Sequence, residues 1–184
     1  MRRCLLILVW TVGIDVQFFS QNEPSSKVIS NHSYGNTLVG KTVIQDVIKE
    51  NGAGFHLDSV KYIKMFADMG GYCMHIMGTH KLYRYKYLGI TYIVTNGDTI
   101  SGIVFYPPFA GHTDKGEAIG ITKLSSLNVP TTEGKIHYSN PSGNFDDGGR
   151  ENYMENAKHY IKIDHIFYGF KRRSGNVTEI RIGR

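Results

Sequence analysis

The sequence predicts an α+β fold of two tandem helix-plus-meander modules, whose antiparallel strands form one curved sheet with the helices on one side. Three observations predict it. An amphipathic segment follows Gly40, period-two aromatic and β-branched residues run from Ser59 to Phe105, and the helix signal returns 80 positions later. At 184 residues the chain has the size of one domain or of two small halves that share a core.

The N-terminus, MRRCLLILVWTVGIDVQFFSQ, has two arginines, an apolar run from Leu5 to Ile14 and polar residues after it. This layout predicts a signal peptide over residues 1–21 and a mature protein in the periplasm or outside the cell. Asp15 is unusual so close to the apolar run, and the alternative is an N-terminal strand or a buried anchor. Residues 22–37 are polar and unpatterned, which predicts a flexible tether.

The segment VGKTVIQDVIKENG predicts the first helix. Thr42 and Gln45 have the spacing of a capping box, and Asn51-Gly52 is a typical helix end. The apolar residues fall on one helical stripe, which packs on the sheet: Val43, Ile44, Val47 and Ile48.

After this helix the alternation predicts four antiparallel strands near 59–67, 72–77, 82–95 and 100–106, with turns at 68–71 and 96–98. The first module then spans residues 38–110 and the second spans 111–184.

The second module is predicted from a recurrence. Gly40 and Thr42 reappear as Gly120 and Thr122, and the same distance of 80 residues separates Gly89 from Gly169. The alternative is that glycine and threonine mark two unrelated turns.

A helix that opens with Gly-x-Thr, ahead of a meander closed by a glycine-containing hairpin, resembles the module of the small lipoprotein of the outer-membrane assembly machinery. Two such modules in tandem resemble the secreted β-lactamase inhibitor proteins. The resemblance covers roughly residues 38–184, and it implies this fold and a binding role without naming a partner. The disulfides of those inhibitors are missing here.

The distribution of charge and the number of cysteines argue against nucleic-acid binding and against an internal disulfide. The net charge of +5 is scattered apart from Lys171, Arg172 and Arg173, so nucleic-acid binding gets little support. Removal of residues 1–21 would leave Cys73 as the single cysteine, which cannot form an internal disulfide.

The histidines raise the question of a metal or catalytic site, but no tight pair of ligand spacings accompanies them, and we expect no metal and no cofactor. The residues considered as possible ligands or catalytic groups are Cys73, His75, His80, His112, His137, His159 and His165. No nucleophile elbow, phosphate loop or calcium-loop pattern is present either, so a hydrolase that uses His and Asp residues is the third choice.

Two features favour recognition of a protein. On one strand over 82–95, alternation would put Tyr83, Tyr85 and Tyr87 on the open face of the sheet, where tyrosines supply contact area. The alternative is that tyrosine simply suits a half-exposed strand.

The second feature is the long polar loop at 139–152, which carries Phe145 beside Asp146 and Asp147. We expect these three residues to enter a basic cleft of a partner; the alternative is a solvated loop without function. The sequence as a whole predicts a secreted, non-enzymatic inhibitor or immunity protein that blocks a toxin or hydrolase, with an envelope-assembly scaffold as the alternative.

Overall fold

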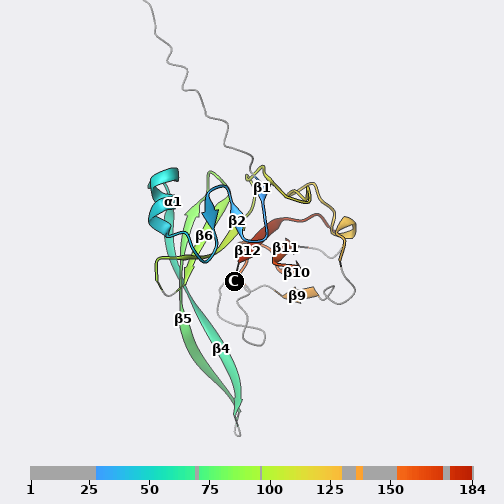
Figure 1. Ribbon diagram of the computed structural model, residues 1–184. Helices are drawn as coiled ribbons and strands as arrows, with labels where there is room; N and C mark the ends of the chain where they lie inside the picture. Colours follow the sequence, from blue (N-terminus) through green and yellow to red (C-terminus); the bar gives the residue numbers. More distant parts are fainter. Residues whose placement is uncertain are drawn as a thin grey trace, which may run out of the picture.

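The computed structural model describes residues 28–68, 71–95, 97–129, 136–138, 153–171 and 175–183, without the side chains of 62–77, 137 and 138. The described chain is mostly antiparallel β-structure (Figure 1). It contains one α-helix, α1 (Ile44–Asn51), and one short 3-10 helix, η1 (Leu124–Ser126).

The main sheet has eight strands in the order β4-β5-β6-β7-β12-β11-β10-β9, and each pairs antiparallel with its neighbours. Two four-stranded meanders therefore meet along β7 and β12 in the middle of the sheet. The strands are β4 (His56–Asp68), β5 (Gly71–Tyr85), β6 (Ile90–Thr95), β7 (Ile100–Phe105), β9 (Ile136–Tyr138), β10 (His159–Ile163), β11 (Ile166–Phe170) and β12 (Glu179–Gly183).

A second, four-stranded sheet joins the first residues of the described chain to residues after β7. Its order is β3-β2-β1-β8, and its strands are β1 (Val28–Ile29), β2 (Ser33–Tyr34), β3 (Thr37–Leu38) and β8 (His112–Thr113). Ile29 is completely buried, so the expected tether does not extend beyond Val28. The part of that expectation before Val28, and the expected signal peptide, lie outside the described residues.

The expected α+β fold of two helix-plus-meander modules is wrong, because the second half builds no α-helix among its described residues. The segment after Thr122 forms only η1. Ser125, Ser126 and Asn128 are weak helix formers, and Pro130 disfavours a helical backbone in the residue before it. The sequence there begins like a helix but cannot continue as one.

Helix α1 forms where the sequence predicts it, with Ile44 and Val47 buried and Ile48 partly buried, but Val43 of the expected stripe is the exposed N-cap residue. The expected capping box of Thr42 and Gln45 does not form. A valine holds the N-cap position and makes no side-chain cap, while the Thr42 hydroxyl accepts a backbone N–H of the preceding turn at 2.8 Å.

The Gly-x-Thr turn is repeated in the two halves. Gly40 and Gly120 both have positive φ, 80° and 77°, and donate their N–H to Ile100 and Val177 at 2.8 Å. In both turns the threonine hydroxyl accepts the N–H of the residue four positions earlier. Gly89 and Gly169 are not equivalent, because the first lies in a hairpin and the second inside β11.

Both faces of the central strands are buried. One face packs against α1, the small sheet and residues 119–129, and it holds most of the apolar core. The other face carries smaller apolar clusters and a row of buried polar groups, which residues 153–157 cover. That row consists of His80, Thr91, Glu179 and Arg181.

Candidate functional site

A two-stranded ribbon projects from one end of the main sheet (Figure 1). Strand β4 pairs with β5 along its whole length, from His56 opposite Arg84 to Asp68 opposite Gly71. Strand β5 in turn pairs with β6 only from His80 to Tyr85. Residues 61–68 and 71–79 therefore extend beyond the third strand, and we call these two segments the ribbon.

The ribbon follows from its sequence. KYIKMFAD and GYCMHIMGT are rich in aromatic, β-branched and methionine residues, which suit extended strands. The pairing of Asp68 with Gly71 agrees with the turn expected at 68–71. Among the described residues, no third strand pairs with the edges of the ribbon.

The pairing register makes one face of the ribbon apolar. One extra residue, Met77, lies on β5 between the pairs Tyr62–Gly78 and Ile63–Ile76, and the register is regular from there to the tip. Cross-strand pairs on one face contain only apolar and aromatic residues: Ile63 with Ile76, Met65 with Met74, and Ala67 with Tyr72. We call these six residues the apolar row.

The opposite face of the ribbon is mixed, with Lys64 opposite His75 and Phe66 opposite Cys73. The ribbon is thus amphipathic, as expected of a strand pair with one face against another surface. A hairpin of two strands alone is marginally stable in water and needs a further strand or a packing surface.

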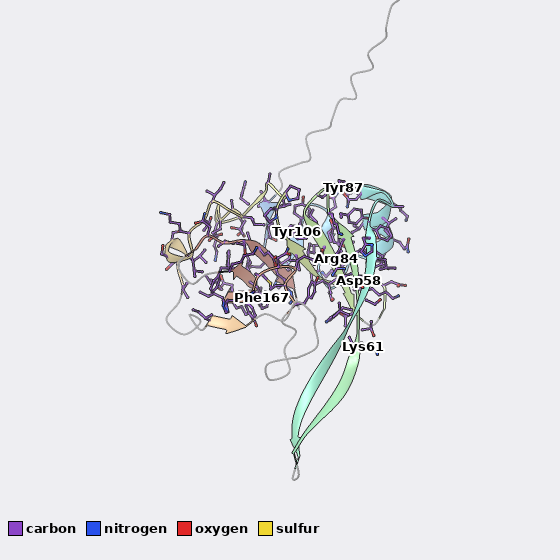
Figure 2. The ribbon with its side chains drawn as sticks, turned by 180° about the vertical axis from the view of Figure 1, so that it is seen from behind. Asp58, Lys61, Arg84, Tyr87, Tyr106 and Phe167 are labelled. Atoms are coloured by element: carbon purple, nitrogen blue, oxygen red, sulfur yellow. The ribbon has the colours of Figure 1, made fainter. Side chains whose placement is uncertain are left out.

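Lysines stand at the base of the apolar row. Lys61 shares its face of β4 with Ile63 and Met65 by strand alternation, and Lys81 lies on the same face of β5, opposite Ser59. Both lysines are exposed, and neither forms an ion pair with another described side chain. Figure 2 shows Lys61 where the ribbon leaves the body of the molecule.

A polar cluster lies on the parts of β4 and β5 that belong to the body, with Arg84 of β5 at its centre (Figure 2). Its guanidinium bonds Asp58 of β4 at 2.7 Å, Glu155 at 2.5 Å and the Tyr153 hydroxyl at 3.0 Å. Tyr153 also donates to Glu155. The hydrogen bond from Arg84 lowers the pKa of the Asp58 carboxyl below its usual range. One cation therefore joins both ribbon strands to residues 153–157.

Glu179 of β12 holds the same covering segment on the sheet. Its carboxylate accepts the backbone N–H groups of residues 155, 156 and 157 at 2.9, 2.5 and 3.1 Å. Arg181 donates to the carbonyl of Tyr153 at 2.8 Å. Burial raises the pKa of Glu179 to about 7, although the three N–H bonds act in the opposite direction.

His80 lies at the junction between the ribbon and the sheet, and it is 2 % exposed. Its Nδ1 is 2.6 Å from the hydroxyl of Thr95, which is in turn 2.8 Å from that of Ser101. Burial, followed by the charge of Arg181, lowers the pKa of His80 to about 4. The buried Glu179 and Arg181 of this face thus hold the covering segment on the sheet.

The predicted tyrosine face is not formed. Tyr83 is 8 % exposed and Tyr85 is fully buried, whereas Tyr87 is 58 % exposed. The expected strand over 82–95 is in fact two strands joined by a hairpin at 86–89, so the assumed alternation breaks there.

The two buried tyrosines belong to the core beneath α1. The Tyr85 hydroxyl donates to the carbonyl of Gly52 at 2.8 Å, and Phe55 packs against both rings. Tyr87 lies at the end of the sheet opposite the ribbon (Figure 2), where its hydroxyl donates to Asn51. The other predicted contacts, Phe145, Asp146 and Asp147, lie outside the described residues.

Among the described residues, no three His, Cys, Asp or Glu side chains form a group that could hold a metal ion. Within the same residues, no helix has the length and apolar character needed to cross a membrane. No family model matches the chain, and neither the curated proteins nor the solved structures contain a match to it.

Proposed function

We propose that the protein is a non-enzymatic protein-binding module that docks through the apolar row of its ribbon. The observation that carries this proposal is the projection of a two-stranded ribbon beyond the third strand of the sheet, with the apolar row on one face and Lys61 at the base of that row. Burial of that face against a partner would stabilise the ribbon as well as the complex.

The composition of the row supports a protein surface as its complement. Methionine, tyrosine and isoleucine fill irregular apolar pockets, and methionine adapts to more than one shape. Arg84, through Asp58 and Glu155, fixes the parts of β4 and β5 in the body from which the ribbon continues.

The most concrete form of this function is an inhibitor or immunity protein that acts outside the cytoplasm. Its ribbon would enter a cleft of a toxin or hydrolase and exclude the substrate. The leader-like pattern of residues 1–21 supports this version.

A capture experiment with the native secreted and envelope fractions tests the proposal. The bait is compared with a ribbon variant, Met65→Lys with Met74→Lys, and with a matched control, Leu38→Lys with Ile121→Lys. The control changes two exposed apolar residues away from the ribbon, at 46 % and 78 % exposure. Far-UV circular dichroism and thermal unfolding show whether each variant folds.

We expect one stoichiometric protein on the wild type and on the control, absent from the folded ribbon variant, and a loss of that protein's activity on binding. Equal retention by all three baits would contradict a role of the ribbon. Retention of a membrane complex without any change of activity would favour the scaffold version.

A further inference from the structure

Strand β4 is an edge strand of unusual length. It is the first strand in the sheet order, and no other described strand pairs with its outer side. It runs for 13 residues, from His56 to Asp68. An edge of this kind presents a row of backbone N–H and C=O groups that another strand can use.

Strand β4 is regular along its length, although its neighbour β5 contains a bulge. The irregularity between Tyr62 and Ile63 comes from the extra residue Met77 on β5, so β4 itself has no inserted residue. Edge strands are commonly protected by a bulge or by being short, and β4 has neither device. Its outer side can therefore pair without interruption.

The charges on β4 select against a second copy of this chain. Symmetric antiparallel pairing of two β4 strands over their full length is centred on Tyr62. It places the two copies of Lys61 in diagonal positions on one face, with Lys81 beside each. Like charges in diagonal positions disfavour the pairing, although less than like charges directly opposite each other.

The same charges fit a strand that carries an acid. On the face of the apolar row, β4 presents Leu57 at 50 % exposure, then Ser59 and Lys61, then Ile63 and Met65. A neighbouring strand with apolar residues at alternate positions would extend this face. A carboxylate at the level of Lys61 would lie beside this lysine, which has no ion pair with any described side chain, while Lys81 lies one strand further away on β5.

We propose that the outer edge of β4 receives an extended strand of the partner protein, with alternating apolar residues and an acidic residue opposite Lys61. This inference rests on the proposed function and specifies its mode of recognition. The strand joins the sheet through backbone hydrogen bonds, and the apolar alternation and the carboxylate supply specificity.

A display library of random dodecapeptides, selected against the full chain, tests this mode directly. We expect the enriched peptides to alternate apolar residues around one Glu or Asp. Their binding should slow hydrogen exchange at alternate amides of residues 56–68. The variant Lys61→Glu with Lys81→Glu should bind the acidic peptides about tenfold more weakly and bind lysine-substituted versions better.

N-methylation separates strand addition from side-chain docking. Methyl groups on the alternate peptide amides that face β4 should abolish binding, whereas methyl groups on the other alternate set should leave it within about threefold. Equal effects of the two sets overturn the proposal, and so does a selection that yields no peptide protecting β4. Sedimentation that shows a dimer of the free chain with protected β4 amides overturns it in favour of a second copy.

The capture experiment and the peptide experiment can refute the two proposals separately. A partner that is lost with Met65→Lys and Met74→Lys but leaves the β4 amides unprotected keeps the proposed function and removes strand addition. A partner retained by that variant removes the proposed function itself.

Discussion

The guanidinium of Arg84 and the carboxylate of Asp58, 2.7 Å apart, connect β5 and β4 inside the sheet, where Arg84 pairs with Thr91 of β6, before the two strands continue as the ribbon. The same guanidinium is 2.5 Å from Glu155, in the segment that covers the far face of the sheet. The position of the ribbon therefore depends on contacts between residues that are far apart in the sequence.

Replacement of Arg84 by alanine should lower the free energy of unfolding by about 3 kcal/mol, because it leaves the largely buried Glu155 without its cation. Replacement of Asp58 by alanine should have a much smaller effect, since this carboxylate is about half exposed. Urea denaturation of both variants measures the difference. Equal losses would show that Glu155 does not depend on Arg84.

Replacement of Gly89 by alanine should destabilise the hairpin between β5 and β6 by more than about 3 kcal/mol. Its φ is +67°, and an added Cβ would meet the backbone of Tyr106 and Phe109. Gly52→Ala is the matched control, because Gly52 has a φ of +79° with open space around it, and it should cost about 1 kcal/mol. Similar losses in the two variants would show that conformation alone matters at Gly89.

His80 should make the fold sensitive to acid. Its folded pKa of about 4 lies below its ordinary value of 6.5, so the unfolded chain binds more protons between these values. The stability contributed by neutral His80 is fully present above pH 6.5 and is lost as the pH falls through 4. His80→Asn should remove this part of the pH dependence. Parallel profiles of wild type and variant in urea denaturation from pH 4 to 7 would contradict the assignment.

Glu179 should act in the opposite direction. Its folded pKa of about 7 lies above its ordinary value of 4.5, so the folded chain binds more protons between these values. Its contribution is fully present below pH 4.5 and is lost as the pH rises through 7. The wild type should therefore lose stability relative to Glu179→Gln over that interval. A difference that stays constant, or changes in the other direction, would show that the carboxylate is stably ionised on the sheet.

Local patterns in the sequence predict the elements that depend on neighbours along the chain. Helix α1 and the hairpin from β6 to β7 form as expected, although Val43 of the predicted stripe is exposed. The expected second helix does not form, because Ser125, Ser126 and Asn128 have low helix propensity after a start that resembles that of α1.

The hairpin at 86–89 follows a run of alternating tyrosines that is typical of one continuous strand, and Gly89 is its only local turn signal. A continuous strand would place Tyr83 and Tyr85 at the surface, whereas with the hairpin they lie in the core. The strands and the turn of the ribbon are readable from the sequence, but its projection is not. That projection arises because β6 stops at Thr95, opposite His80, and such pairing lengths are set by the whole sheet.

Site-specific photo-cross-linking shows whether the apolar row contacts a partner protein. The photoreactive residue p-benzoylphenylalanine replaces Met65 in the apolar row, or Ile121 as an exposed apolar control, and the protein is irradiated in its native fraction. The account predicts one cross-linked protein from position 65 and none from position 121. The same adducts from both positions, or an adduct from position 121 alone, would contradict a binding surface on the ribbon.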